Sequence, residues 1–233
     1  MLAILGLGFL IGIRHAVESD HVAAVATLAT RVKTVRETVP LGILWGIGHT
    51  LTLFAFGSVV LFLDAAVPER LAIYLELAVG VMLIVLGADI LYRLVRERIH
   101  FHSHTHEDGA VHFHAHSHAG EKQHDPARHF HGHSRALSIR ALFVGIMHGM
   151  AGSAALMLLT LQSVQSIPLG LAYIAFFGLG SILGMALMSV VIALPLKRAA
   201  QSVTWVYNGL KGSVGAATIG LGALMVYQSA GVV

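Results

Sequence analysis

The chain has 233 residues, of which 56% are hydrophobic and only 12% charged, and its mean hydropathy is +0.76. Soluble domains average about a quarter charged residues, so this composition excludes a water-facing globule and a disordered chain. There is no cysteine, which excludes disulfides, thiolate metal sites and thiol catalysis. Sixteen histidines stand beside 12 acidic and 15 basic residues, and this excess is the first sign of metal-ion chemistry.

Six apolar runs are each long enough to cross a bilayer as a helix, which takes roughly 20 residues. They are Leu2–Ala29, Val39–Leu63, Ala72–Tyr92, Leu137–Leu161, Pro168–Leu194 and Val206–Tyr227. Their hydrophobicity is continuous rather than alternating, which favours helices over barrel strands. The first run has no basic start and continues into charged residues, so it does not read as a cleaved signal peptide. The sequence predicts an all-α, polytopic membrane protein with six transmembrane helices.

The basic residues predict how these helices are oriented. Twelve of the 15 Lys and Arg residues lie in the first, third and fifth connections between the runs. By the positive-inside rule these connections face the cytoplasm and both termini lie outside, in the inner (plasma) membrane. Because the bases mark the ends of spans, the pI near 9.4 does not indicate nucleic-acid binding, and the lipid bilayer is the expected partner.

The two halves of the chain resemble each other. Phe9–His15 matches Leu142–His148, Gly46–Leu51 matches Gly178–Leu183, and the glycines of the third run match those of the sixth, at offsets of 133, 132 and 135 residues. Each half has three spans, so the second copy must enter the membrane from the opposite side. Inverted repeats are typical of secondary transporters, whose substrate site lies near the midplane between the halves. We therefore expect two inverted three-helix repeats.

Five ionisable residues stand within the first apolar run, in the segment Arg14–His21. Charged groups at mid-membrane cost roughly 2.5–3.5 kcal/mol each, so they indicate function. On a regular helix His15, Glu18 and His21 share a face, whereas an unwound segment brings His15, Asp20 and His21 together. Two imidazoles and a carboxylate suit Ni²⁺, Co²⁺ or Zn²⁺ better than Cu(I), Mg²⁺ or Ca²⁺. The competing interpretation is an ion pair of Arg14 with Glu18 or Asp20.

Two more histidines lie inside apolar runs. His49 stands between glycines in the second run, and His148 is the repeat partner of His15. Inverted symmetry would bring the spans of His15 and His148 together at the centre. We expect His49 and His148 either to bind the same ion or to orient the groups that bind it.

The third run contains two acidic residues, Glu76 and Asp89. They lie nearer its outer and cytoplasmic ends respectively, and we expect them to pair with Arg70 and Arg93 rather than to form part of an ion path.

Residues 96–136 form a histidine-rich loop between a first repeat at 1–95 and a second repeat at 137–233. Twelve histidines lie between His100 and His133, and many alternate with other residues. An extended chain would place alternate imidazoles on one side, where several can chelate one ion. With few core-forming residues, the loop is expected to be disordered without metal. We expect it to buffer, deliver or sense metal rather than to form the translocation site.

The polar motif of the first run resembles the signature of the nickel/cobalt transporter family (NiCoT), His-x4-Asp-His, with His15, Asp20 and His21 in the matching positions. The element around His49 resembles the family's second motif, Gly-His-Ser/Thr. The resemblance implies that these four residues take part in Ni²⁺ or Co²⁺ recognition, and it favours Asp20 over Glu18 as the carboxylate. It covers mainly the first three spans. The acidic-threonine motif of the importer branch is not found, and the long loop resembles more the efflux and urease-associated relatives.

We therefore expect a transporter of Ni²⁺ or Co²⁺ that works by alternating access to a midplane His/Asp site, and not an enzyme. No Gly-x4-Gly-Lys-Ser/Thr motif is present, so the chain does not itself hydrolyse ATP. No cofactor is expected, the ion being the cargo, and the candidate partners are cytoplasmic nickel chaperones or a nickel-enzyme maturation system. The alternatives are an efflux protein of the same fold, a non-transporting membrane metallochaperone for a nickel enzyme such as urease, and a zinc carrier of another family.

Overall fold

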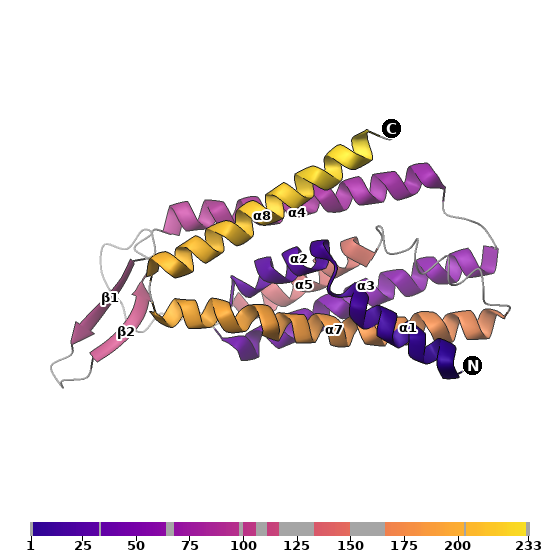
Figure 1. The fold of residues 1–233 in the computed structure, drawn as a ribbon, viewed down its shortest axis with the longest axis horizontal. Coiled ribbons are helices and arrows are strands. Elements are labelled where there is room, and N and C mark those ends of the chain that lie inside the picture. Colours follow the sequence, from indigo (N-terminus) through magenta and orange to yellow (C-terminus); the bar gives the residue numbers. More distant parts are fainter. Residues whose placement is uncertain are drawn as a thin grey trace.

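The computed structural model describes residues 2–32, 34–63, 68–97, 100–105, 111–116, 133–149, 166–202 and 204–231. These ranges hold the helices and strands drawn in Figure 1. They are α1 (Leu2–His15), α2 (Ser19–Ala29), α3 (Val35–Leu63), α4 (Glu69–Glu97), β1 (His100–Thr105), β2 (Val111–His116), α5 (His133–Gly149), α7 (Ile167–Ser202) and α8 (Thr204–Ala230).

The helices form an elongated bundle whose outer surface is apolar. Helices α3, α4, α7 and α8 are each long and apolar enough to cross a membrane, and α1 with α2 makes a fifth candidate span. Large apolar side chains are exposed along these helices, which lipid covers in a membrane protein. Examples are Leu51, Val59, Val85, Leu179, Leu187 and Leu224. The expectation of a multi-pass helical membrane protein is confirmed.

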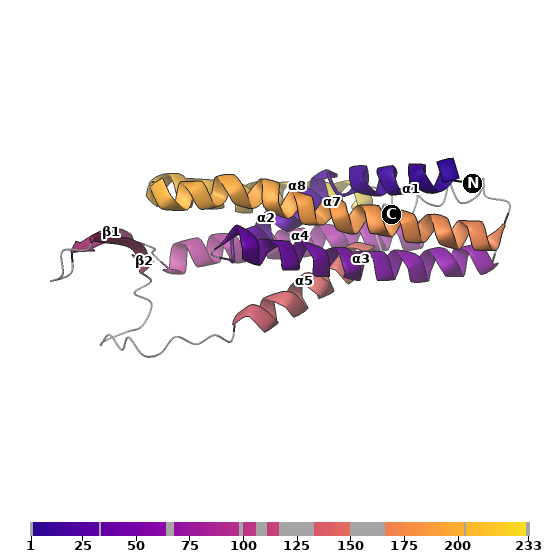
Figure 2. The ribbon, with the colours of Figure 1, turned by 90° about the horizontal axis from the view of Figure 1, so that it is seen from below.

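The described residues contain four or five candidate spans, whereas the sequence predicted six. The structure gives four long helices and the α1–α2 pair. The expected span Leu137–Leu161 is described only as far as Gly149, where α5 ends, and its second half lies outside the described residues. Figure 2 shows α5 lying along α3, on the side away from α1.

The first span is broken at its polar motif. Helix α1 ends at His15 and α2 begins at Ser19, with a bend of 58° between them. A tight turn closes the break, in which the Val17 N–H donates to the Arg14 carbonyl at 3.0 Å and the Glu18 N–H to the His15 carbonyl at 3.0 Å. Of the two arrangements left open by the sequence, the interrupted helix is the one found.

Part of the histidine-rich loop forms a two-stranded antiparallel hairpin, β1–β2. This hairpin lies beyond one end of the bundle, next to the end of α4 and the start of α8 (Figure 1). It adds a small sheet to a fold that is otherwise helical in its described residues.

Glycines stand where helices cross. Gly12 of α1 lies against the carbonyl of Phe177 in α7, and Gly145 of α5 lies against the carbonyl of Trp45 in α3. A Cβ at either glycine would meet backbone atoms, so only glycine allows this approach. The two contacts occupy equivalent positions in the two halves of the chain, because Gly145 follows Gly12 by 133 residues and Phe177 follows Trp45 by 132.

Helices α4 and α8 show the same relation. In the α4–α8 pair, Gly80 lies against Gly222 and Gly87 against Gly215, so the helices run antiparallel. Gly215 and Gly222 follow Gly80 and Gly87 by 135 residues. The repeat therefore converts the Gly80–Gly222 contact into the Gly87–Gly215 contact, with the two helices exchanged.

Replacing Gly12 with alanine is expected to destabilise the bundle by roughly 1–3 kcal/mol, because the added methyl group overlaps the α7 backbone. The matched control is Gly6→Ala in the same helix, since nothing lies within 4 Å of a Cβ at Gly6. Thermal unfolding of the purified protein in detergent compares the two. Equal melting temperatures for Gly12→Ala and Gly6→Ala would contradict the close packing of α1 on α7.

Candidate metal centre

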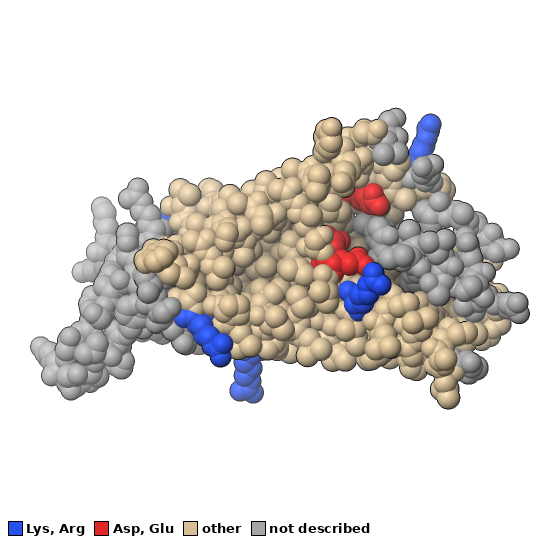
Figure 3. All heavy atoms as spheres, in the orientation of Figure 1, with Lys and Arg blue, Asp and Glu red and all other residues tan. Residues whose placement is uncertain are grey.

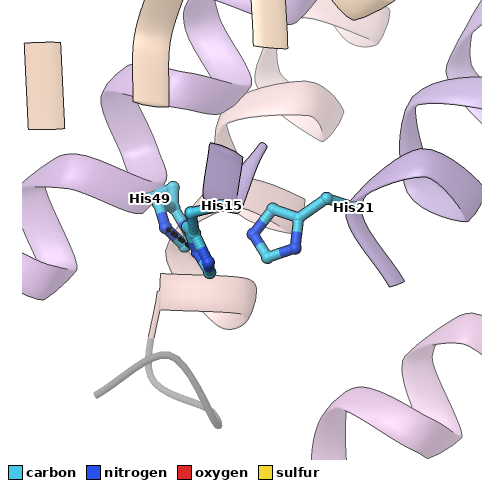
Figure 4. Close-up of side chains that lie close together, drawn as sticks. All are labelled: His15, His21 and His49. Atoms are coloured by element: carbon cyan, nitrogen blue, oxygen red, sulfur yellow. Dashed lines mark hydrogen bonds between the residues drawn. The ribbon is translucent and has the colours of Figure 1, made fainter. Parts of the chain in front are cut away.

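Four buried histidines converge at the centre of the bundle. His15 comes from α1, His21 from α2, His49 from α3 and His148 from α5, and none is more than 3% exposed. The ring centroid of His21 lies 4.3 Å from that of His15, 5.1 Å from that of His49 and 4.7 Å from that of His148. Figure 4 shows the rings of His15, His21 and His49 grouped together. The structure thus brings together all four histidines proposed from the sequence.

The donor atoms form two overlapping sets. His15, His21 and His49 each offer one nitrogen, and these atoms lie within 4.8 Å of one another. Asp20, His21 and His148 form a second set with the same spacing. His21 belongs to both sets, so it stands at the middle of the centre.

His15 is held between a carboxylate and another histidine. Its Nδ1 lies 3.1 Å from Glu18 Oε1, and its Nε2 lies 3.2 Å from Nε2 of His49. An ionised carboxylate only accepts hydrogen bonds, so the Nδ1 of His15 carries the proton. In the neutral imidazole this leaves a lone pair on His15 Nε2, and the proton shared with His49 then comes from His49. The broken span therefore gives Glu18 the role of orienting His15.

Asp20 joins the remaining two histidines. Its Oδ1 accepts from Nδ1 of His21 at 2.9 Å, and its Oδ2 accepts from Nε2 of His148 at 3.1 Å. The other nitrogens, His21 Nε2 and His148 Nδ1, are buried without a hydrogen-bond partner among the described residues, as is His49 Nδ1. Buried polar nitrogens are normally paired, so three unpaired ones in one place fit a centre built to hold an ion.

The walls of the centre include aromatic rings that sequence reasoning did not select. The fully buried Trp45 lies 5.3 Å from His21 and 5.6 Å from His148 between ring centroids, and Phe177 lies 5.4 Å from His15. Trp45 precedes His49 by four residues and so shares its helix face, which is the signal that would have identified it. These rings shield the histidines from lipid and water.

The two carboxylates of the centre reach one face of the bundle. The side chain of Glu18 is 43% exposed and that of Asp20 is 23% exposed. Figure 3 shows acidic side chains reaching the surface near the middle of this face, with a basic side chain beside them. The carboxylates therefore connect the buried imidazoles to the surface.

The C-terminal end of α2 is fixed by two neighbouring helices. Lys197 of α7 donates to the carbonyl of Ala29 at 3.0 Å and to that of Val32, and so caps the end of α2. Asp89 of α4 pairs with Arg31 and also with Arg93 at 3.1 Å. The Asp89–Arg93 pair was expected, whereas the pair with Arg31, whose side chain is only 8% exposed, was not. These contacts hold the helix that carries Asp20 and His21.

The fold and the centre define an integral membrane protein with a buried set of imidazole and carboxylate donors. The family model described as NicO, high-affinity nickel-transport protein, matches residues 1–233. The chain therefore belongs to this nickel-transport family, which is a family of transport proteins rather than enzymes, and the resemblance seen in the sequence motifs is confirmed.

Two curated relatives extend the comparison. The urease accessory protein UreH of Bacillus sp. (strain TB-90) is 36% identical over 205 residues, which cover 87% of this chain and 82% of UreH. The chloroplast protein FOR GROWTH AND FERTILITY 2 of Arabidopsis thaliana is 26% identical over 224 residues, which cover 95% of this chain and 55% of that protein. No solved structure matches the chain.

Replacing Asp89 with asparagine is expected to destabilise the protein by roughly 1–3 kcal/mol. The loss lies below the 3–5 kcal/mol typical of fully buried pairs, because Asp89 is 29% exposed. Arg93→Gln is the matched control, since it removes the more exposed partner of the same carboxylate. Thermal unfolding in detergent measures both, and a larger loss for Arg93→Gln would show that the buried pair does not anchor α2.

Proposed function

We propose that the protein carries Ni²⁺, and also Co²⁺, across the membrane by binding the ion at the buried histidine centre. The observation that carries the proposal is the first donor set, in which His15, His21 and His49 come from three helices and meet within 4.8 Å. Imidazole is a ligand suited to these ions, and the centre contains no thiolate that would select a softer one. Membership of a nickel-transport family supports the same cargo.

Two carboxylates balance the charge of the ion. A divalent cation without compensation is costly in a low-dielectric interior. Glu18 and Asp20, each hydrogen-bonded to a histidine of the set, supply two negative charges against the two positive charges of Ni²⁺. In this arrangement they orient the imidazoles and neutralise the ion, which is the usual role of carboxylates behind metal-binding histidines.

The second donor set gives the ion a neighbouring position. His21 also belongs to the set of Asp20 and His148, and Nδ1 of His148 has no hydrogen-bond partner among the described residues. An ion that leaves His15 and His49 can therefore keep His21 as a ligand while it gains Nδ1 of His148, and Asp20 stays hydrogen-bonded to both histidines. A shared ligand lowers the cost of moving the ion, because the ion is never released completely.

The proposed architecture is six spans arranged as two inverted three-helix repeats. Support comes from the α3–α7 pair, where Gly46 lies against Ile182 and the Thr50 hydroxyl donates to the Gly178 carbonyl at 3.2 Å. Gly178 and Ile182 follow Gly46 and Thr50 by 132 residues, so the two contacts exchange under the repeat. Helices that are equivalent and antiparallel imply a two-fold axis in the membrane plane, and this one passes near His49.

Rocking of one repeat against the other would expose the centre to each side in turn. With the basic connections in the cytoplasm, the hairpin end of the bundle is the cytoplasmic end and both termini lie outside. The repeat partner of His49 is Ser181, so only one repeat supplies an imidazole at this position. The proposed binding site is thus asymmetric although the scaffold is repeated.

A second function is favoured by one relative. UreH is named as a urease accessory protein, and its similarity covers most of this chain. The protein would then serve a nickel enzyme and its cytoplasmic maturation factors, either by supplying nickel through transport or by holding it without transport. Flux of ⁶³Ni²⁺ in sealed vesicles separates the two, because a non-transporting metallochaperone moves no ion across the bilayer.

Uptake of ⁶³Ni²⁺ into proteoliposomes tests the centre directly. We expect His49→Ala to reduce uptake at low Ni²⁺ by roughly 100-fold or more, because losing even the hydrogen-bond partner of a metal ligand costs 10–100-fold. His124→Ala, in the loop, is the control and should leave uptake unchanged. If His49→Ala took up ⁶³Ni²⁺ as fast as the wild type at equal protein content, the site would be refuted. Competition by Co²⁺ and Zn²⁺ ranks the ions by preference.

The two carboxylates should contribute unequally to Ni²⁺ affinity. Asp20 contacts two histidines and Glu18 contacts one, so Asp20→Ala should weaken binding more than the roughly tenfold expected for Glu18→Ala. Trp45 reports binding, because a paramagnetic ion at the centre quenches its fluorescence. The measurement uses a Trp205→Phe background, since Trp45 and Trp205 are the two tryptophans. A stronger effect of Glu18→Ala would reverse the assignment.

A further inference from the structure

Helix α2 lies between the histidine centre and the hairpin end of the bundle. It begins at the centre, with Asp20 and His21 in its first turn, and runs towards the end where the hairpin lies (Figure 1). Its residues Ala24–Thr30 are all buried, seven in succession. A helix that is buried on every side is enclosed by its neighbours, and α2 contacts α3, α4, α7 and α8. The direct route from the centre to this end of the bundle is therefore filled by α2.

This stretch of α2 gives an ion nothing to bind on that route. Between His21 and Arg31 the chain has no ionisable side chain. The hydroxyl groups of Thr27 and Thr30 donate to carbonyls of the same helix, at 2.7 Å in both cases. A dication in such an apolar, self-satisfied region is costly, so an ion leaves the centre in this direction only if α2 moves.

Two kinds of contact hold the end of α2. The pair of Arg31 with Asp89 joins α2 to α4, and both helices belong to the first half of the chain. The Lys197 ammonium group instead comes from α7, in the second half, and donates to the carbonyls of Ala29 and Val32. Carbonyls at a helix end lack partners within the helix and attract cations, which explains why an ammonium group is buried there. Only the Lys197 contacts must break when the halves move apart.

An apolar cluster closes the same place. Ala29 of α2 is fully buried and packs with Leu196 of α7 and Tyr207 of α8, which are 2% and 9% exposed. This cluster also joins the first half of the chain to the second. Lys197 follows Leu196 directly, so the apolar cluster and the ammonium group act on the same turn of α2.

We infer that the C-terminal half of α2 is the gate between the centre and the hairpin end, and that Lys197 is the latch that holds it closed. The role of the gate, which rests on the proposed transport function, is to keep the ion from this end until α7 and α8 move away from α2. The Arg31–Asp89 pair keeps α2 on α4 during that movement. On the predicted orientation the gate faces the cytoplasm.

Reactivity of a thiol in the gate tests the latch. The chain has no cysteine, so Ala29→Cys carries a single thiol. A membrane-impermeant thiol reagent is applied to inside-out vesicles, which expose the cytoplasmic side. We expect Lys197→Met to raise the labelling rate of Ala29→Cys roughly 10-fold or more, because a charged hydrogen-bond donor to two carbonyls is lost. Arg198→Met, at the exposed neighbouring position of α7, is the matched control and should leave the rate unchanged.

A second reporter separates opening of the gate from loosening of the whole bundle. Val79→Cys places the thiol at a fully buried position in the first half of α4, away from the gate, and its labelling should not respond to Lys197→Met. Equal acceleration at both reporters would overturn the inference, because Lys197 would then stabilise the fold in general. An unchanged rate at Ala29→Cys would overturn it as well.

Ni²⁺ binding to the wild type, followed by quenching of Trp45 in the Trp205→Phe background, is measured separately. Absence of quenching would refute the proposed function rather than the gate, and the comparison of labelling rates stays valid in that case.

Discussion

The carboxylate of Asp20 links the central histidines across the two halves of the chain. A charged group within hydrocarbon is costly unless it is compensated, and Asp20 is compensated by N–H groups of His21 and His148. The contact with His148 crosses from the first half of the chain to the second, so this one side chain joins the halves at the centre. It also decides which nitrogen of each imidazole stays free. The orientation of the donors thus follows from the need to satisfy a buried charge.

The break in the first span is what makes this arrangement possible. On an uninterrupted helix Asp20 would point away from the face shared by His15 and His21. The turn at residues 16–18 re-aims α2, and Lys197 with the Arg31–Asp89 pair holds its far end in place. Broken helices at mid-membrane are tolerated where they line a site, because the freed backbone groups find partners there. Here the turn itself supplies those partners.

Close helix approach serves the same centre. Gly48 of α3 lies against Leu142 of α5, and Gly149 of α5 lies against the His49 backbone, so glycines stand directly beside His49 and His148. Without side chains at these crossings, the histidines of neighbouring helices come within reach of one another.

The sequence by itself determined the class of the protein and most of the central residues. Continuous apolar runs indicated membrane helices, and the cost of placing His15, Asp20, His21 and His49 in such runs marked them as candidate functional residues. These inferences depend on composition and spacing, which are local. The offset repeat added His148 as a candidate by comparing the two halves.

Only the tertiary structure decided how these residues are used. Periodicity alone did not choose between a regular helix and a broken one. The separate contacts of Glu18 with His15 and of Asp20 with His21 and His148 depend on the break in the first span. Trp45, Arg31 and Lys197 were missed because an apolar wall, a buried ion pair and a helix cap depend on which helices meet. Contacts between residues more than 100 positions apart, such as Asp20 with His148, arise from the packing of whole helices, which the local sequence does not encode.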